Sequence, residues 1–415
     1  MKVTLSPEKL QGSVKAPPSK SYMHRALICA ALSEGETEIL CDSFSQDIIA
    51  TASCLERLGA EVKMGDGKIV VGTVRRTDST VTIDCNESGS TLRFILPFVA
   101  ALGQNTVITG AKRLGERPLA PLCEAISGSG VEISCENGSS LPCTIKGKMQ
   151  SGEYSVKANI SSQFVSGLIM ALAMQGGSVV AEGEIVSAPY INMTLDIMRR
   201  FGMGVAQKGN VFEIEKNTAP APKSICAEGD FSNAAFWLVA GVIGNGTIIC
   251  ENLSENTKQG DIKITQILKQ MGGDITFENS RVIARPSCLT GIEIDAENIP
   301  DLVPVLCVAA ACADGQTVIR NIARLREKES DRVESTIAML GALGGDIRCE
   351  GNTLIVRKSK LRSGEVESFN DHRIAMAAAV ASVATDGEVT INGAEAVNKS
   401  YPDFFEKFHS LEVRV

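Results

Sequence analysis

Residues 19–32 read SKSYMHRALICAAL, and this stretch decides how the chain folds. It opens with hydroxyl groups and cations, and apolar residues then recur at helical spacing. The hydroxyl of Ser19 or Ser21 can cap the helix by accepting a hydrogen bond from a first-turn N–H group. Lys20 and Arg25 flank that end, where the helix dipole already favours an anion. The stretch therefore predicts a phosphate or carboxylate site at the start of a buried helix.

Five further stretches repeat this design, each about 70 residues after the last. In each, a polar segment precedes an apolar run: Ser88-Gly89-Ser90 before FILPFVAAL, Ser161-Ser162-Gln163 before FVSGLIMALAM, Phe231-Ser232-Asn233 before AAFWLVAGVI, Pro300-Asp301 before LVPVLCVAAACA, and Asn370-Asp371-His372-Arg373 before IAMAAAVASVA. A helix that is apolar on nearly every side is enclosed by protein, and these runs are too short to cross a bilayer.

A second repeated pattern is an amphipathic helix that ends at a glycine and leads into a strand. Its copies end at Gly59, Gly130, Gly202, Gly272 and Gly344, with Ser410 in a degenerate last copy. Glycine suits the left-handed turn at the C-terminus of a helix. Strand pairs lie between the copies. The sequence therefore predicts an α/β protein of six repeated βαβαββ units, three per domain, with buried helices at each centre.

The phase of the repeat also predicts the domains. The first helix starts near residue 20, so the opening strand is assigned to the last repeat. We predict an N-terminal domain of residues 14–227 and a C-terminal domain of residues 228–415 plus 1–13. The Ala/Pro/Lys segment 217–223 is the best candidate for a linker.

Composition excludes several classes of protein. A net charge of −8 and 4% aromatic residues argue against a nucleic-acid surface. Thirteen cysteines without a CxxC pair, and three histidines, predict reduced buried thiols in a cytoplasmic protein without a metal site. The first residues lack an apolar region, so we expect no secretory signal. No Gly-rich phosphate loop or serine-nucleophile elbow is present, and we expect no nucleotide cofactor.

Cations recur at related positions in the repeats, ahead of the buried helices. They are Lys20, Arg25, Arg117, Lys328, Arg332, Arg373 and Lys399. Two facing domains would bring them into a cleft that suits ligands with several negative charges. Asp301, Glu329 and Lys20 are candidate acid–base groups. Solvated surface charges, a simple helix cap at Ser161 and a structural role for His372 remain the alternatives.

Several motifs together resemble the 5-enolpyruvylshikimate-3-phosphate synthase family. They are PPSKSYMHRALICAAL, GERP, SSQF, VSAPY, LREKESDR, FNDHRIAMA and KSYPDF, between about residues 10 and 407. The resemblance implies a two-domain inside-out α/β barrel. It also implies transfer of the carboxyvinyl group of phosphoenolpyruvate to the 5-hydroxyl of shikimate 3-phosphate by addition–elimination, in the shikimate pathway towards chorismate and aromatic amino acids.

The resemblance also implies roles for individual residues. Contacts to shikimate 3-phosphate fall to Lys20, Ser21, Arg25, Ser161, Ser162, Gln163, Ser187, Asp301 and Lys328, with Tyr190 close by. Contacts to phosphoenolpyruvate fall to Lys20, Gly89, Arg117, Gln163, Arg332, Arg373 and Lys399. Asp301 and Glu329 are implied as proton carriers, with Lys20 and Lys328 assisting. The partners are then two small-molecule substrates, and we expect a monomer with no metal, cofactor, nucleic acid or membrane.

The loop at residues 87–94 departs from the family pattern. The usual Asn-Ala-Gly-Thr-Ala-Met-Arg-Pro is replaced by ESGSTLRF, so Glu87, Ser88 and Phe94 differ. We expect these changes to weaken or reshape binding of phosphoenolpyruvate, or of glyphosate, the inhibitor that occupies its site in the family. Arg324 also stands where many relatives carry Asn.

Two other classes of protein share some of these features. The sister carboxyvinyl transferase that acts on UDP-N-acetylglucosamine usually has a reactive cysteine on a mobile loop. The corresponding residues 112–119 contain no cysteine, and Cys123 is assigned to the following helix. A non-catalytic DNA clamp also uses repeated α/β units, but the acidic balance of this chain argues against it.

Overall fold

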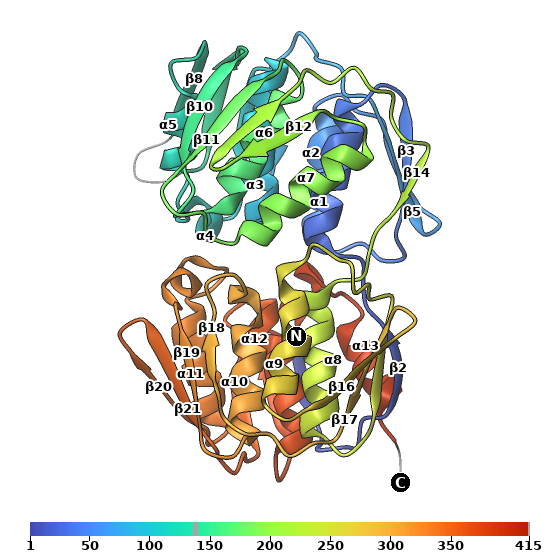
Figure 1. The fold of residues 1–415 in the computed structure, drawn as a ribbon, viewed down its shortest axis with the longest axis vertical. Coiled ribbons are helices and arrows are strands. Elements are labelled where there is room, and N and C mark those ends of the chain that lie inside the picture. Colours follow the sequence, from blue (N-terminus) through green and yellow to red (C-terminus); the bar gives the residue numbers. More distant parts are fainter. Residues whose placement is uncertain (136–139, 414–415) are drawn as a thin grey trace. The chain divides into compact units, whose positions relative to one another are not determined.

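The computed structural model describes residues 1–135 and 140–413 of the chain. It divides into two compact units (Figure 1). Unit 1 consists of Met1–Pro17 and Glu228–Val415, and unit 2 consists of Pro18–Ala227. Each unit has its own hydrophobic core.

Unit 2 is a continuous segment. Its helices are α1 (Lys20–Leu32), α2 (Gln46–Arg57), α3 (Gly89–Leu102), α4 (Lys112–Gly115), α5 (Ala120–Ile126), α6 (Ser162–Leu172) and α7 (Ala188–Arg200). Its strands are β3 (Glu36–Leu40), β4 (Val62–Gly65), β5 (Lys68–Gly72), β6 (Val81–Asp84), β7 (Thr106–Thr109), β8 (Val131–Cys135), β9 (Cys143–Gly147), β10 (Gly152–Lys157), β11 (Gly177–Glu182), β12 (Val205–Lys208), β13 (Val211–Ile214) and β14 (Ser224–Cys226).

Unit 1 is assembled from both ends of the chain. Its α-helices are α8 (Phe231–Ile243), α9 (Lys263–Gln270), α10 (Val303–Cys312), α11 (Arg332–Ala342), α12 (His372–Ala381) and α13 (Phe404–Leu411). Its 3-10 helices are η1 (Gly260–Ile262), η2 (Pro300–Leu302), η3 (Ala323–Glu327), η4 (Ser382–Ala384) and η5 (Ala394–Lys399). Its strands are β1 (Lys2–Leu5), β2 (Gly12–Lys15), β15 (Ile248–Glu251), β16 (Asp274–Glu278), β17 (Arg281–Arg285), β18 (Glu293–Asp295), β19 (Gln316–Arg320), β20 (Asp346–Glu350), β21 (Thr353–Arg357), β22 (Gly364–Glu367) and β23 (Val389–Asn392).

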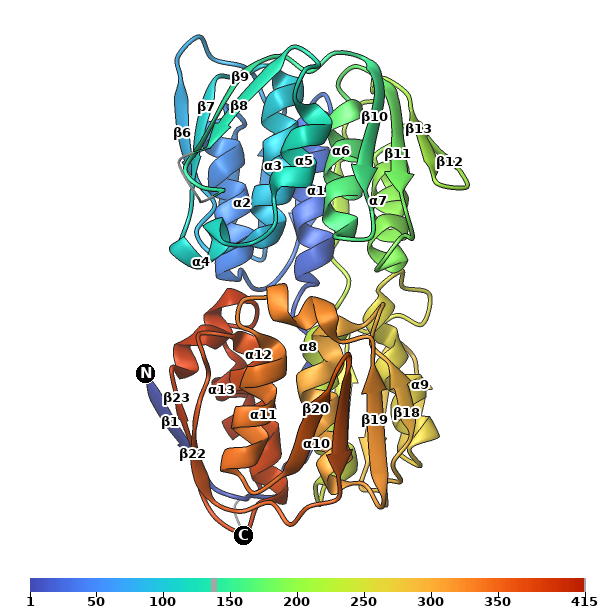
Figure 2. The same ribbon diagram turned by 90° about the vertical axis from the view of Figure 1, so that its left-hand side faces the viewer.

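Six small sheets occur among the described residues, which confirms the prediction of six repeated α/β units. In four repeats a buried helix connects two parallel neighbouring strands, as in β6-α3-β7 and β18-α10-β19. An antiparallel hairpin completes both of the sheets named here: β8-β9 in the sheet of β6 and β7, and β20-β21 in the sheet of β18 and β19. Figure 2 shows the sheet of β18–β21 outside α10.

The other two parallel pairs join strands that are far apart in the chain. They occur where the chain passes between the units, and we call this strand exchange. Strand β2 precedes the first crossing and pairs in parallel with β15 of unit 1. Strand β14 precedes the second crossing and pairs in parallel with β3 of unit 2. Strand β1 pairs with β23, and Lys2 lies opposite Asn392. Each crossing therefore leaves a strand behind in the unit that the chain departs from.

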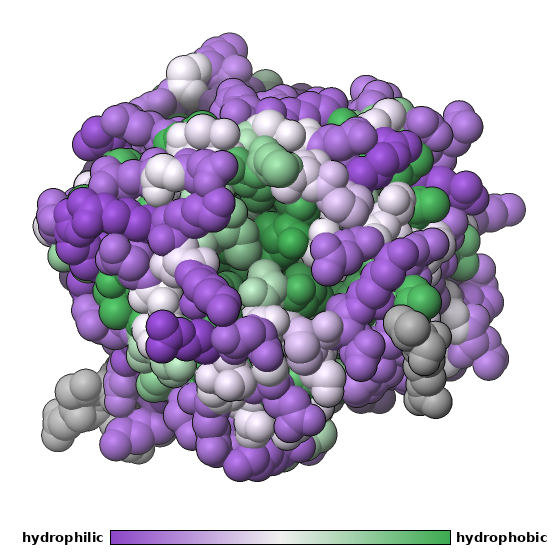
Figure 3. Space-filling model, turned by 90° about the horizontal axis from the view of Figure 1, so that it is seen from below, coloured by the Kyte–Doolittle hydropathy of each residue, from purple (hydrophilic) through white to green (hydrophobic). Residues whose placement is uncertain are grey.

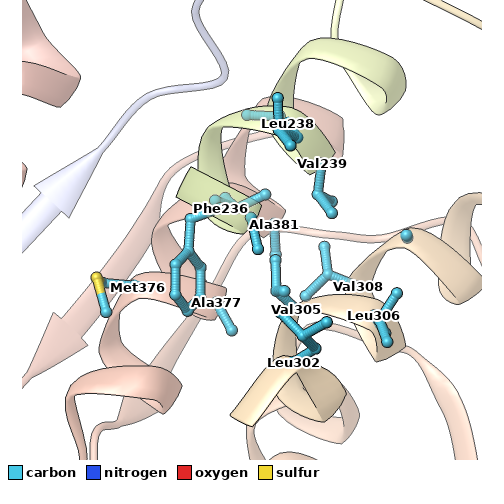
Figure 4. Close-up of a cluster of buried hydrophobic side chains, with 14 of the residues drawn as sticks. Phe236, Leu238, Val239, Leu302, Val305, Leu306, Val308, Met376, Ala377 and Ala381 are labelled. Carbon is cyan, nitrogen blue, oxygen red and sulfur yellow. The ribbon is translucent and has the colours of Figure 1, made fainter. Parts of the chain in front are cut away.

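The apolar runs form the buried helices at the centre of each unit, as predicted. In unit 1, α8, α10 and α12 each pack against the other two, and all ten residues of α12 are buried. Figure 4 shows Val239, Val305 and Ala381 from these three helices pointing towards one another. In unit 2, α3 packs against α6 and also against α1. A helix with no polar side is stable only in such a position, where packing covers its whole surface.

The predicted glycine turns are also confirmed. Gly59, Gly130, Gly202, Gly272 and Gly344 all have a positive φ, between 72° and 99°. A side chain at such a backbone angle is strained, whereas glycine is not. In the degenerate last copy, Ser410 lies within α13, which ends at Leu411.

The candidate linker at residues 217–223 runs along unit 2. The Asn217 N–H donates to the Ala173 carbonyl at 2.7 Å, and the Ala221 N–H donates to the Glu34 carbonyl at 2.8 Å. These backbone bonds fix the segment along unit 2. Its proline and alanine content reflects an extended docked segment rather than a connection between the units.

The chain instead passes between the units at Pro17–Pro18 and at Ala227–Glu228. The first of these differs from the predicted boundary between residues 13 and 14. Strand β2 pairs with β15 over its full length and therefore stays in unit 1 as far as Lys15. Beyond it, the Asp230 N–H donates to the Pro17 carbonyl at 2.9 Å.

One end of unit 1 carries an apolar hollow surrounded by polar residues (Figure 3). At this end the last residues of α8 and α10 border a pocket of about 670 Å³. It is lined by Ile243, Asn245, Cys312, Lys358, Ser359, Lys360, Leu361, Val383, Ala384 and Thr385. None of the helices in the described part of the chain has the length and apolar character needed to span a bilayer.

Candidate active site

The start of α1 holds a cation close to a carboxylate of the protein itself. Ser19 is the N-cap, and its hydroxyl accepts from the Tyr22 N–H at 3.4 Å. The Lys20 ammonium group lies 2.8 Å from Asp47 Oδ2, in the first turn of α2. Both side chains are largely buried, with exposed fractions of 14% and 12%. Asp47 therefore fixes the Lys20 ammonium group at the helix N-terminus.

Arg25 is buried one turn further along α1. Its guanidinium donates to Thr194 Oγ1 at 2.7 Å, the Ser21 carbonyl at 2.7 Å and the Tyr190 carbonyl at 3.0 Å. Burial lowers the pKa of Arg25 to about 10, so it stays cationic at neutral pH. The predicted residues Ser21, Arg25 and Tyr190 are thus together. Ser187, the N-cap of α7, precedes Tyr190 by three residues and has φ 52°.

A second group of predicted residues surrounds the start of α3. A Cβ atom added at Gly89 would lie 2.5 Å from Arg117 Nη1. Gln163 accepts from Arg93 Nη1 at 3.0 Å and donates to Ser90 Oγ at 2.9 Å. The same added atom at Gly89 would lie 2.8 Å from Arg93 Nη1. Gly89, Arg117 and Gln163 are therefore neighbours, and the absent side chain at Gly89 makes room for two guanidinium groups.

The Ser-Ser-Gln segment begins α6. Ser161 is the N-cap, and its hydroxyl accepts from the Gln163 N–H at 3.2 Å. Ser162 is buried in the first turn. The simple capping role considered for Ser161 is present. The first-turn N–H groups of this helix still form an anion-binding end.

Unit 1 gathers the remaining predicted residues around Asp301 in η2. Asp301 Oδ1 lies 2.6 Å from Arg332 Nη1 and 3.2 Å from Lys328 Nζ, and Oδ2 lies 3.9 Å from Arg373 Nη2. Burial raises the pKa of Asp301, but Lys328, Arg332 and Arg373 together outweigh it and hold the pKa well below its usual value. Asp301 is therefore an ionised carboxylate at neutral pH.

Arg332 is the most enclosed cation of this group, with 1% of its side chain exposed. Besides Asp301 it contacts Glu329 Oε2 at 2.7 Å and Asp371 Oδ2 at 2.8 Å. Burial opposes its charge, but the three carboxylates outweigh burial and raise the pKa of Arg332. Burial lowers the pKa of Lys328, with Asp301 opposing the shift.

Arg373 and Lys399 lie at the edge of the same group. Arg373 Nη1 donates to the Ser232 carbonyl at 2.7 Å. Lys399 Nζ donates to the Asn370 carbonyl, one residue before Asp371. The structure therefore brings Asp301, Lys328, Glu329, Arg332 and Arg373 together, and Lys399 approaches the segment that carries Arg373.

Sequence reasoning missed four residues that hold the predicted site residues in place. Asp47, Thr194, Arg93 and Asp371 each hold a predicted site residue by a direct hydrogen bond. Arg93 and Asp371 belong to segments that the sequence analysis singled out, so their position was a usable signal. Asp47 and Thr194 lie on the neighbouring helices α2 and α7, and only the tertiary fold brings them to α1.

The unusual residues of the 87–94 loop have structural roles. The Ser88 hydroxyl caps α3 by accepting from the Thr91 N–H at 3.2 Å. The Phe94 ring is buried, with its centroid 4.9 Å from the Arg25 guanidinium carbon. Phe94 therefore contacts the guanidinium group of Arg25 directly. The expected effect of this loop on phosphoenolpyruvate or glyphosate binding stays a prediction.

Comparisons with known proteins cover almost the whole chain. Residues 5–408 match the family model described as EPSP synthase (3-phosphoshikimate 1-carboxyvinyltransferase). The 3-phosphoshikimate 1-carboxyvinyltransferase of Clostridium kluyveri is 42% identical over 414 residues, covering 99% of this chain and 97% of the relative. The protein of the same name from Methanococcus maripaludis is 34% identical over 423 residues, covering 99% and 98%.

Solved structures give the same answer for the fold. EPSP synthase from Acinetobacter baumannii has a TM-score of 0.84 and 27% identity, covering 99% of this chain and 98% of that chain. The enolpyruvyl transferase NikO from Streptomyces tendae has a TM-score of 0.79, covering 99% and 97%. At 16% identity, the likeness to NikO concerns the fold alone.

Proposed function

This chain belongs to the EPSP synthase family, and from that premise we propose which of its residues carry out each part of the reaction. The reaction is transfer of the carboxyvinyl group of phosphoenolpyruvate to the 5-hydroxyl of shikimate 3-phosphate, with release of phosphate, in the shikimate pathway. The predicted family, the two-domain inside-out α/β fold and the enzyme activity are confirmed.

Shikimate 3-phosphate is assigned to the helix starts of unit 2. Its phosphate would take the charge of Lys20 and Arg25 and the N–H groups that begin α6, at Ser161 and Ser162. The hydrogen bonds that immobilise Arg25 support this role, because a guanidinium already held in place loses little entropy on binding an anion. Ser21, Gln163 and Ser187 complete the predicted contacts in unit 2.

Phosphoenolpyruvate is assigned to the guanidinium groups of Arg117, Arg332 and Arg373, with Lys20, Lys399, Gln163 and Gly89. The close approach of Arg117 to Gly89 supports this role. Bidentate guanidinium groups match both the carboxylate and the phosphate of this substrate. Asp301 and Lys328 would meet the ring hydroxyls of shikimate 3-phosphate.

The chemistry proceeds by addition and elimination. A proton is added to the methylene carbon of phosphoenolpyruvate, and the 5-hydroxyl oxygen attacks the adjacent carbon while losing its own proton. Loss of phosphate and of a methyl proton from this tetrahedral intermediate restores the double bond. Cations fixed around the reacting carbon stabilise charge as it develops, and exclusion of water prevents hydrolysis of the intermediate.

The environment of Asp301 is the observation that carries this assignment. Because three cations lower the pKa of Asp301, this carboxylate is ionised and can accept a hydrogen bond from the 5-hydroxyl, along which the proton would leave. Glu329, held through Arg332, and Lys20 are the remaining proton carriers. The substrates are small molecules, and we propose that the enzyme acts in the cytoplasm as a monomer.

A phosphate-release assay with phosphoenolpyruvate tests the acceptor directly. We expect turnover with shikimate 3-phosphate and none with UDP-N-acetylglucosamine. Lys20→Met, Arg117→Ala and Glu329→Gln should each lower kcat/KM by at least about 100-fold, because each removes a charge that meets the reacting groups. Lys360→Met, on an exposed side chain of unit 1, is the matched control. Near-normal turnover by Glu329→Gln would show that its assigned role is wrong.

A further inference from the structure

Asp261 is a buried carboxyl group that none of the roles above uses. It lies in η1, and its side chain is not exposed at all. Gln259, the residue just before η1, accepts from the Phe231 N–H at 2.9 Å and donates to the Gly229 carbonyl at 2.7 Å. These two bonds tie η1 to the start of α8. Asp261 therefore has a fixed position beside the first turn of that helix.

Two hydrogen bonds in series connect Asp261 to Arg373. The Ser232 side chain is hydrogen-bonded to Asp261 Oδ2, and the Ser232 carbonyl accepts from Arg373 Nη1 at 2.7 Å. Ser232 begins α8 and Arg373 begins α12, and these two helices pack together. The buried Arg373 Nε atom has no hydrogen-bond partner in the described part of the chain.

The surroundings of Asp261, taken together, oppose its ionisation. Burial and the carboxylates of Asp301 and Asp230 disfavour its negative charge, whereas the hydrogen bond from Ser232 and the charge of Arg373 favour it. The balance raises the pKa of Asp261 to about 7. Burial contributes most, followed by Asp301. The neutral and ionised forms of Asp261 thus interchange close to neutral pH.

We propose that Asp261 is a positioning residue for Arg373 in phosphoenolpyruvate binding, and that its neutral form is the one that supports binding. In the neutral form Asp261 holds Ser232, and Arg373 directs its charge to the substrate. In the ionised form Asp261 adds a second carboxylate beside Arg373, after Asp301, and competes with the substrate anion for that charge. This proposal rests on the assignment of Arg373 to phosphoenolpyruvate.

The test is the pH dependence of KM, measured separately for the two substrates from about pH 6 to about pH 9. In the unmodified enzyme, KM for phosphoenolpyruvate should rise by up to about tenfold per pH unit above the pKa of Asp261. Asp261→Asn keeps an acceptor for the Ser232 hydroxyl but cannot ionise. Its KM for phosphoenolpyruvate should change less than about twofold over the alkaline range, and its kcat at about pH 6 should stay within about twofold of normal.

Two further variants make the test specific. Ser232→Ala removes the hydrogen bond that favours ionisation of Asp261, so the alkaline rise should move to higher pH. Asp274→Asn, an exposed aspartate of the same unit that pairs with Arg285, is the matched control and should keep the normal profile. KM for shikimate 3-phosphate should show no alkaline change that Asp261→Asn removes.

An unchanged alkaline rise in Asp261→Asn would overturn the proposal. Thermal unfolding at about pH 8 checks the fold, and Asp261→Asn should be at least as stable as the unmodified enzyme because a buried acid is removed. Arg373→Lys separates this inference from its premise. If Arg373→Lys leaves KM for phosphoenolpyruvate unchanged, the assignment of Arg373 itself fails. If it raises that KM and Asp261→Asn has a normal profile, only the role of Asp261 fails.

Discussion

Arg332 shows how this protein keeps a charged group buried at its site. Three carboxylates, from Asp301, Glu329 and Asp371, contact one guanidinium within 3 Å. Removing one partner from such a group leaves an uncompensated charge, which is costly in a buried position. The same arrangement orients the donors of Arg332 and the acceptors of Asp301. Stability and site geometry are therefore coupled at these residues.

The contribution of Asp301 to stability depends on pH. Its pKa in the folded protein is lower than in the unfolded chain, so its ionisation stabilises the fold above about pH 4. That contribution is lost as the pH falls through the folded pKa. Asp301→Asn should lower the free energy of unfolding by about 1–3 kcal/mol at neutral pH, and by progressively less in acid.

Urea unfolding at several pH values measures this difference. Asp346→Asn, an exposed aspartate on β20, is the control and should change stability by less than about 0.5 kcal/mol. A difference between Asp301→Asn and the unmodified enzyme that stayed constant down to about pH 3 would contradict the expectation.

Gly89 is a residue whose missing side chain matters for binding. A methyl group there would overlap the Arg117 guanidinium at 2.5 Å and displace it. Gly89→Ala should therefore raise KM for phosphoenolpyruvate by about tenfold or more, with a much smaller effect on KM for shikimate 3-phosphate. Steady-state kinetics with each substrate varied in turn will separate the two. Equal effects on both KM values would mean that Arg117 does not serve phosphoenolpyruvate alone.

At the scale of elements, two helical glycines offer a matched comparison. Gly167 of α6 faces α3, and a Cβ atom there would lie 2.4 Å from the Arg93 carbonyl oxygen. Gly341 of α11 has nothing within 4 Å of the same atom. Gly167→Ala should destabilise unit 2 by about 2 kcal/mol or more, because α6 must move away from α3. Gly341→Ala should be neutral or stabilise by up to about 1 kcal/mol.

Chemical denaturation of the two variants tests this comparison. Equal stability of Gly167→Ala and the unmodified enzyme would show that α3 and α6 separate easily. Because the Arg93 side chain also holds Gln163, activity of Gly167→Ala should fall even at temperatures where the variant stays folded.

The elements that sequence predicts best are those whose signal is local. The six apolar runs become helices because no other arrangement covers an apolar surface on all sides, and four glycines, at residues 59, 202, 272 and 344, end helices because their backbone angle requires it. The start of α10 was less well predicted, since Pro300–Leu302 forms a 3-10 turn before the α-helix. The positions of the cations could be predicted because these residues lie near the starts of the buried helices. Asp47, the carboxylate partner of Lys20, lies on the neighbouring helix α2 and has no local signal.

At the scale of the whole molecule, the phase of the repeat predicted that the opening strand belongs with the last repeat, but the sequence did not indicate which strands pair at the two crossings. The pairing of β2 with β15 and of β14 with β3 joins segments that are far apart in the chain, and alternation within a strand says nothing of its partner. The Ala/Pro segment at residues 217–223 had the composition of a linker. Its backbone bonds to Ala173 and Glu34 show that composition alone does not identify one.

Strand exchange predicts which fragments fold. Residues 18–227 contain every strand of the three sheets of unit 2, so this fragment should fold alone. Residues 228–415 lack β1 and β2, each an edge strand of a sheet in unit 1, and should be unstable or aggregate. Linking Pro17 directly to Glu228 should restore a folded unit 1, because Pro17 already bonds to Asp230.

Circular dichroism and amide exchange of the three fragments measure this expectation. Cooperative unfolding of residues 228–415 without the first 17 residues would show that β1 and β2 are dispensable. Failure of residues 18–227 to fold would mean that unit 2 depends on unit 1.

The pairing of Lys2 with Asn392 has a consequence for how the protein is made. As the chain emerges from the ribosome, β1 appears long before its partner β23 is translated. Unit 2 can complete its three sheets while the remaining part of unit 1 is still being synthesised. The leading segment must therefore wait, exposed and unpaired, for most of translation. If translation slows or stops late in the message, unit 2 will already be folded, but the leading segment with β1 will remain unpaired. Chaperones and proteases recognise such a segment.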